Sequence, residues 1–332
     1  MMEFYGSAHN HTDRSNFRLR DSTNRLDQLC WYAAKDLGHN FIAITDHETI
    51  ATAIDCQKVE KEIRKEYPNF KIIRGNEIYL CRDGLNKDNY ERGKDRFWHW
   101  ILLAKDAIGH EQLREISTRA WSHCFKQGKM LRVPTYYSDI QEVIGVNPGH
   151  VIMSTACRGS FISTRILDYA KEPNEELYNH IISYLKNMSD ICGKENFFLE
   201  VQPSFDKEQI LINQTYKKIS EDIGFPVIIT LDAHYLKKED ESIHHAFLTA
   251  QEGDRETSSF YASTYMMGRE EIHSYMDNSI GKETVSQWMN NTKLIYDLCE
   301  DYDLTKPLHI PYLPKTIDTI SEEEFLSFKD LI

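Results

Sequence analysis

The chain has 332 residues, 41% hydrophobic and 27% charged, so it is long enough for one large or two ordinary domains with a sizeable core. Lysine and arginine number 39 against 52 aspartate and glutamate residues, which gives a formal net charge of -13. This balance excludes nucleic-acid binding by bulk electrostatic attraction, so any such contact must be local.

The cysteines and the N-terminus predict the compartment. The seven cysteines are scattered, odd in number and never spaced as Cys-x-x-Cys, which favours reduced thiols over a disulfide framework. The first residues lack the basic and apolar regions of a signal peptide, and no apolar run approaches membrane-spanning length. We therefore expect a cytoplasmic protein that makes no membrane contact.

Short apolar runs alternate with helical patterns along the chain, which predicts a βα protein with a largely parallel sheet. Residues 22–24 are expected to cap a helix that Gly38 ends. The charged segment 82–96 reads as a surface insertion. Strands are predicted at 4–7, 41–45, 71–73, 97–103, 150–154, 197–201 and 226–231, with helices near 54–63, 108–124, 138–144 and on to about 192.

Metal-binding side chains follow these apolar runs. A strand at 4–7 would direct His9 and His11 to the same side, where two imidazoles can bind one transition metal, although a chain with 14 histidines can contain His-x-His by accident. His9, His47, Glu77, Cys157 and Asp232 each follow a different run. The C-terminal ends of parallel strands converge on one rim of a βα barrel, so we expect these residues to meet there.

Six motifs occur in the order AHNH, TDHE, GNEIYL, FWHWILLAK, STACRGS and TLDAHYL. Together they resemble the PHP (polymerase and histidinol phosphatase) family, and most closely the N-terminal PHP domain of the bacterial DNA polymerase III α subunit. The resemblance covers residues 3–275 well and continues more weakly to the end. It implies an α/β fold, a distorted (β/α)7 TIM-like barrel over residues 1–270, followed by a helical and extended tail over 271–332.

The resemblance also implies a site for three divalent metal ions. One ion would be bound by His9, His11, Glu77 and Asp232, a second by Glu77, His99 and Cys157, and a third by Asp21, His47 and His234. Asp13, in the same loop, is an alternative to Asp21. A mixed set of imidazoles, carboxylates and a thiolate suits zinc or manganese, with iron possible, and suits calcium or magnesium poorly.

The expected chemistry is hydrolysis by a metal-activated water, because clustered ions lower the pKa of a shared water and neutralise phosphate oxygens. Glu77, Asp232 and His234 would then act through the metals, and no side-chain nucleophile is needed. Arg158, next to Cys157, is expected to bind phosphate.

Other polar residues near the motifs leave alternatives open. Arg14, Arg18 and Arg20 are either phosphate clamps or a solvated loop. Asp46 either orients a ligand imidazole or caps the next helix.

The C-terminal part predicts helices from about residue 270, which Pro307, Pro311 and Pro314 interrupt. Ser321 and Glu324 form a capping box that predicts one more helix. In the polymerase family the palm domain follows here, and this chain has no counterpart of it, so we expect no polymerase activity from this chain alone. The last helix would dock a separate polymerase subunit or fold back on the barrel.

The sequence therefore predicts a metal-dependent phosphoesterase that acts as a 3'-5' exonuclease on the 3' end of single-stranded DNA. A small-molecule phosphomonoesterase of the histidinol phosphatase type is one alternative. The other is a catalytically silent structural module of a split replicase, whose metals only stabilise the assembly.

Overall fold

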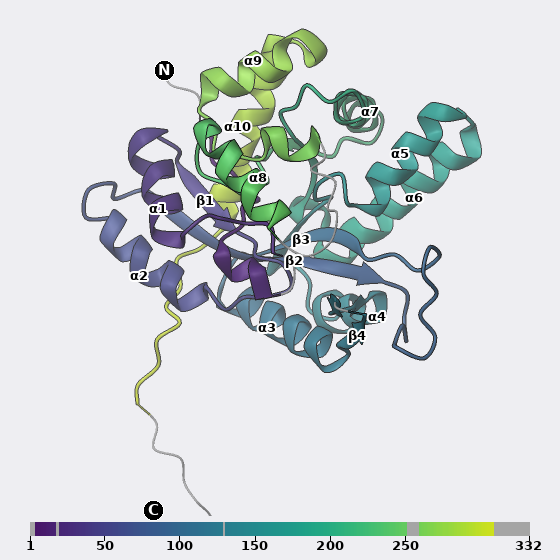
Figure 1. Cartoon of the computed structure of the whole chain (residues 1–332), viewed down its shortest axis with the longest axis horizontal. Coiled ribbons are helices and arrows are strands. Elements are labelled where there is room, and N and C mark those ends of the chain that lie inside the picture. The colour runs from purple at the N-terminus through teal and green to yellow at the C-terminus, as the bar shows by residue number, and fades with distance from the viewer. Residues whose placement is uncertain (1–3, 18–19, 129, 251–258, 309–332) are drawn as a thin grey trace, which may run out of the picture.

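The computed structural model describes residues 4–17, 20–128, 130–250 and 259–308. Its centre is a seven-stranded, strongly curled sheet in the order β1-β2-β3-β7-β8-β9, with β6 paired to β2 outside this path (Figure 1). A separate hairpin joins β4 (Phe125–Gln127) to β5 (Met130–Arg132). The sheet strands are β1 (Phe41–Ile44), β2 (Lys71–Cys81), β3 (Trp98–Ala104), β6 (Thr135–Tyr136), β7 (Val151–Ser154), β8 (Phe197–Val201) and β9 (Val227–Ile229).

One strand of the sheet runs against the others. The pairs β1–β2, β7–β8 and β8–β9 are parallel, but β3 is antiparallel to both β2 and β7. The start of β3 therefore lies at the same rim as the C-terminal ends of its neighbours. This reversal is why His99, near the beginning of its strand, can join residues that follow or end other strands.

The prediction of a strand at 4–7 was wrong, because this segment forms single bridges rather than a ladder. Ser7 bridges to Ile42 of β1, and Asn10 bridges to Ala233, just beyond β9. The backbone N–H of Ala43 donates to the Ser7 carbonyl at 2.8 Å, and that of His11 donates to the Ala233 carbonyl at 3.0 Å. The N-terminal segment thus connects the two edges of the curled sheet and completes the distorted barrel.

Helices cover the outside of the barrel, with α1 and α2 on one side, α3 and α4 on another, α5 and α6 on a third, and α7, α9 and α10 on a fourth (Figure 1). Among the described helices, none combines the length and apolar character needed to cross a membrane. Their bounds are α1 (Leu26–Trp31), α2 (Ala53–Ile63), α3 (Ala107–Ser122), α4 (Tyr137–Ile140), α5 (Phe161–Lys171), α6 (Glu175–Cys192), α7 (Lys207–Ile223), α8 (Glu241–Thr249), α9 (Arg269–Ile280) and α10 (Lys282–Leu298).

The cap expected at residues 22–24 does not form. The N-cap of α1 is Arg25, which makes no side-chain capping bond. The Asn24 amide instead donates to the carbonyls of His11 and Ala233. Asn24 therefore joins the N-terminal segment to the chain beyond β9 and does not cap the helix.

Strand alternation divides the apolar side chains into two clusters. Outward residues such as Ile42, Leu102 and Val227 pack under the helices. Inward residues fill the barrel together with Ile295 of α10 and Cys299, and they are Phe41, Ala43, Ile73, Ile101, Leu103, Ile152, Phe198 and Ile228. The barrel interior is therefore a packed core in its lower half, and the C-terminal end of α10 covers that half.

The last described helices share this core. Gly6 N–H donates to the Thr292 hydroxyl at 3.2 Å, and the Asn291 amide donates to the Val227 carbonyl at 2.8 Å. The division at residue 270 stays a prediction about sequence organisation. Pro311, Pro314 and the expected capping box of Ser321 and Glu324 lie outside the described residues.

A glycine allows α3 to approach β7. A Cβ added at Gly109 would lie 1.9 Å from the backbone oxygen of His150, which neither partner can relieve by a rotamer change. Gly109→Ala should therefore lower the free energy of unfolding by about 2 kcal/mol, measured by urea denaturation. Gly145→Ala is the matched control, because the nearest atom there is 3.7 Å away and alanine favours helix. Equal stability of the two variants would contradict this packing.

A buried histidine should make stability depend on pH. Burial, and then the Arg269 guanidinium, lower the pKa of His39 to about 3, while His39 Nε2 lies 3.0 Å from the Met267 carbonyl oxygen. Between that value and the unfolded value near 6.5, only the unfolded chain binds the proton, so stability falls as pH falls. From pH 7 to pH 5 this loss should be about 2 kcal/mol.

The test compares urea denaturation of the parent and His39→Gln at both pH values. Glutamine keeps a donor for the Met267 carbonyl but does not titrate. The parent should lose about 2 kcal/mol more than the variant on acidification. An identical loss in both proteins would rule out His39 as the titrating group.

Candidate metal centre

The same strand alternation that builds the inner core delivers polar side chains to its upper rim. On β2 the inward series continues from Ile73 to Glu77, and beyond β9 it continues from Ile228 to Asp232. Glu77 lies within β2 rather than after a short strand at 71–73, so that prediction was too short. Side chains far apart in sequence therefore meet above a buried apolar floor.

The first cluster consists of His9, His11 and Glu77, whose ligand atoms all lie within 4.8 Å of one another. Asp232 belongs to the same group, because its Oδ1 is 3.2 Å from His9 Nε2 and 3.0 Å from His11 Nε2. The two Nε2 atoms are 3.0 Å apart. All four side chains are buried.

The second cluster consists of Glu77, His99 and Cys157. His99 Nδ1 lies 2.9 Å from Glu77 Oε1 and 3.3 Å from Cys157 Sγ. Glu77 and Cys157 are buried, whereas His99 is partly exposed. This cluster is thus the one that reaches the surface.

The third cluster consists of His11, His47 and His234. Asp21 joins it, with Oδ2 at 3.3 Å from His47 Nε2 and 3.7 Å from His234 Nε2. Asp13, the alternative to Asp21, is exposed. The structure therefore brings Asp21 to the cluster and leaves Asp13 on the surface.

All the side chains proposed as ligands from the sequence meet in one continuous site, and that they bind metal stays a prediction. The second cluster has the residues expected of it. His11 faces two clusters at once, since it stacks on His47 at 4.1 Å between ring centroids. The groups share Glu77 and His11, so they are neighbours rather than separate sites.

The donor set fits divalent cations. Asp21 Oδ1 and both carboxylate oxygens of Asp232 are buried and accept no hydrogen bond from the described residues. A buried carboxylate oxygen without a hydrogen bond is costly, and imidazole nitrogens and carboxylate oxygens that converge within 4.8 Å of one another are arranged as ligands around a cation. The buried His and Glu clusters can therefore hold more than one metal ion.

Burial and the neighbouring carboxylates have opposite effects on the pKa values of two imidazoles in the site. Burial lowers the pKa of His9, but the Asp232 and Glu200 carboxylates outweigh it and raise this pKa to about 10. Burial also lowers the pKa of His47, which Asp21 and Glu77 raise to about 10. Without cations, the carboxylates thus draw protons onto the imidazoles, and metal binding must displace those protons.

The other two imidazoles behave oppositely. Burial, followed by the neighbouring His47, holds the pKa of His11 well below its usual value. Burial lowers the pKa of His234 to about 4, although Asp232 and Asp21 partly oppose this. These rings are therefore neutral near pH 7, the form in which imidazole binds a metal.

Backbone strain is concentrated at this rim. Within the described residues, the non-glycine residues with positive φ are Glu48 (51°), Ala156 (55°) and Asp232 (48°). They follow β1, β7 and β9 and adjoin or include His47, Cys157 and Asp232. Each costs about 1 kcal/mol or more and persists only where the surroundings fix it, a pattern typical of functional sites.

Sequence reasoning missed Glu200 of β8. Its Oε1 lies 2.6 Å from His9 Nδ1 and accepts from the Thr230 hydroxyl at 2.7 Å, while Oε2 accepts from the Ser154 hydroxyl at 2.6 Å. A carboxylate on Nδ1 directs the opposite nitrogen, Nε2, toward the site. The signal was a glutamate inside the otherwise apolar run Phe197–Val201.

Two further contacts hold the imidazoles. Asp46 accepts hydrogen bonds from the Thr12 and Ser15 hydroxyls, and Ser15 Oγ lies 3.2 Å from His11 Nδ1. Asp46 therefore reaches a ligand ring through Ser15. The Tyr79 hydroxyl lies 3.0 Å from His47 Nδ1. Tyr79 is two residues beyond Glu77 on β2, so the alternation itself could have predicted it.

A cavity of about 790 Å³ opens beside the second cluster and is lined by His99, Cys157 and Arg158. Arg158 forms ion pairs with Asp206 at 3.3 Å and with Glu208. Arg158 is therefore positioned at the entrance, but its charge is already balanced by carboxylates. Of the loop arginines, Arg14 and Arg20 are exposed, and Arg18 lies outside the described residues.

Known proteins share the sequence of this chain over most of its length. A PHP domain matches residues 7–204. "Probable DNA polymerase YorL" of Bacillus subtilis (strain 168) is 40% identical over 320 residues, 93% of this chain and 24% of that protein. DNA polymerase III subunit alpha of Borreliella burgdorferi is 26% identical over 303 residues, 88% of this chain and 24% of that protein. A solved amidohydrolase from Chromobacterium violaceum superimposes with a TM-score of 0.42 at 12% identity, over 70% of this chain and 88% of that one.

The chain belongs to the PHP domain family, because the match covers more than half of it. It is homologous to the bacterial and phage DNA polymerases, but it spans about a quarter of the length of those polymerases. The resemblance inferred from the motifs is therefore confirmed.

Removing the charge of Glu200 should weaken metal binding. Glu200→Gln keeps the shape but loses the carboxylate that fixes His9, so the affinity for Mn²⁺ or Zn²⁺ should fall by about 10-fold or more. The affinity is measured by titrating the metal ion into the protein in competition with a chelating indicator. Glu195→Gln, an exposed change in the short 3-10 helix before β8, is the control and should leave affinity unchanged. Unchanged affinity of Glu200→Gln would show that His9 does not need this partner.

Proposed function

We propose that this chain is a metal-dependent phosphodiesterase that removes nucleotides from the 3' end of single-stranded DNA. The observation that carries the proposal is a set of three adjoining ligand clusters beside one open cavity. Glu77 links the first cluster to the second, and His11 links the first to the third. Divalent ions held there, zinc or manganese by the donor chemistry, would lower the pKa of a water and neutralise phosphate oxygens.

The chain's own residues would prepare this reaction. Glu200 and Ser15 orient the imidazoles of His9 and His11 through their Nδ1 atoms. Both carboxylate oxygens of Asp232 accept no hydrogen bond from the described residues, so they are available to bind a cation. Arg158 would bind the phosphate, and this requires that Asp206 and Glu208 release part of its charge.

Nucleic acid is the substrate class that the relatives favour, since those proteins are described as DNA polymerases. The proposal includes a cytoplasmic location and a separate polymerase subunit as partner, with no polymerase activity from this chain alone.

The first experiment incubates the metal-loaded protein with oligonucleotides labelled at the 3' or the 5' end, with Mn²⁺ and Zn²⁺ tested separately. Stepwise shortening from the 3' end that a chelator stops is the expected result. Turnover of a phosphate monoester alone would instead indicate a small-molecule phosphomonoesterase. If the chelator lowers thermal stability and neither substrate turns over, the metals are structural.

Loss of one ligand should abolish hydrolysis without unfolding the protein. Asp232→Ala should reduce the rate by more than about 100-fold, because even residues that only support a metal ligand contribute up to that factor. Since Asp232 has φ of 48°, where alanine is strained, Asp232→Asn is the better-matched second variant. Asp13→Ala is the control and should retain full activity. Full activity of both Asp232 variants would show that Asp232 is not a metal ligand needed for hydrolysis.

A further inference from the structure

An exposed aromatic residue lies between two residues that line the cavities near the candidate metal centre. Phe205 is 66% exposed. Its neighbours in sequence, Ser204 and Asp206, both line the small cavity that continues past Arg158, and Asp206 also lines the larger cavity at the metal centre. The Phe205 backbone therefore lies at the rim of these cavities, and its ring lies outside their lining, on the surface next to them.

The ring of Phe205 is held in a fixed orientation. It stacks on Tyr275 of α9 with 4.2 Å between ring centroids and 22° between planes. Tyr275 is 7% exposed, and its hydroxyl lies 3.2 Å from that of Tyr265. One face of Phe205 is thus supported by buried structure, and the ring presents much of its remaining surface to solvent. A pre-oriented aromatic surface loses little entropy when a flat ligand stacks on it.

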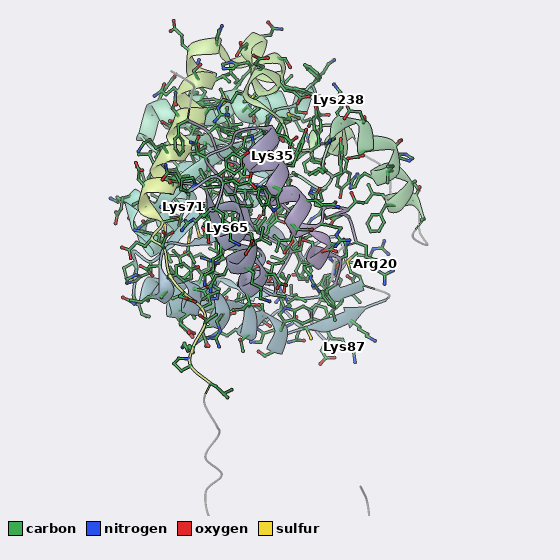
Figure 2. The ribbon with its side chains drawn as sticks, turned by 90° about the vertical axis from the view of Figure 1, so that its left-hand side faces the viewer. Arg20, Lys35, Lys65, Lys71, Lys87 and Lys238 are labelled. Carbon is green, nitrogen blue, oxygen red and sulfur yellow. The ribbon has the colours of Figure 1, made fainter. Side chains whose placement is uncertain are left out.

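Cations accompany this ring. Lys238 Nζ is 5.9 Å from the centre of the Tyr275 ring, and Lys207 lines the cavity. Lys238 and Arg20 lie on the same side of the molecule, at the right in Figure 2. Exposed aromatic rings among scattered cations are the pattern by which proteins bind single-stranded nucleic acid. Because the chain carries a net charge of -13, and Asp206 pairs with Arg158, stacking must contribute more here than charge.

We propose that Phe205 is a stacking platform for a base of single-stranded nucleic acid whose end enters the cavity of His99, Cys157 and Arg158. The inference rests on the proposed function and specifies how its substrate is recognised. A cavity of about 790 Å³ has room for a terminal nucleotide, and the next part of the strand would pass over Phe205. Every base has an aromatic face, so recognition would not depend on sequence.

The test measures binding by fluorescence anisotropy, with the full chain loaded with Mn²⁺ and a labelled phosphorothioate oligothymidylate that resists hydrolysis. Phe205→Ala should raise the Kd about 10-fold, and Phe205→Trp should restore parental binding. An abasic oligonucleotide of the same length should bind equally to the parent and to Phe205→Ala. The matched control is Val146→Ala, which truncates an apolar side chain that is 75% exposed and lines neither cavity, and it should change nothing.

Hydrolysis of the ordinary phosphodiester oligonucleotide separates the two proposals. Phe205→Ala should raise KM and leave kcat within about twofold, because the ring does not touch the reacting atoms. If the parent cleaves DNA but Phe205→Ala binds it as tightly as the parent does, the platform is wrong and the nuclease function stands. If binding falls in Phe205→Ala but neither protein ever cleaves DNA, the platform stands and the nuclease function is wrong.

Discussion

Buried carboxylates without hydrogen bonds are the constraint on which the rest of this structure depends. Asp232 has both oxygens in that state and Asp21 has one, and both side chains are buried at the rim. Such groups cannot be neutralised by solvent, so the imidazoles around them must either carry protons or share cations with them. The raised pKa values of His9 and His47 describe the first state, and the convergent ligand atoms describe the second.

The barrel separates this polar rim from its apolar floor by strand alternation alone. On the parallel strands the inward series begins with an aliphatic or aromatic side chain and ends in a polar one, as in Ile228, Thr230 and Asp232. On the reversed strand β3 the order is opposite, from His99 to Leu103. The apolar floor is buried and is covered by the end of α10. Left-handed residues follow β1, β7 and β9, at the places where the chain leaves the strands beside the candidate ligands.

An acidic protein that acts on nucleic acid needs local recognition. Arg158 and Lys207 are cations that line the cavity at the candidate metal centre, and Asp206 and Glu208, which line it too, leave little net charge there. An aromatic surface such as Phe205 on Tyr275 works without net charge, because stacking does not require the phosphates. The acidic composition and a nucleic-acid substrate are therefore compatible.

The sequence by itself determined the family, the alternation of strands and helices, and the side chains that meet at the rim. Those properties are encoded locally, in motif order and in apolar runs. It did not reveal that β3 is reversed, that residues 4–7 form single bridges, or that Asn24 joins the N-terminus to the chain beyond β9 instead of capping α1. It also missed Glu200, because a glutamate in an apolar strand acquires its role only from His9, which is 191 positions away in sequence. Tertiary structure decided these features. Each of them depends on a hydrogen bond between a buried polar group and a partner that is distant in sequence.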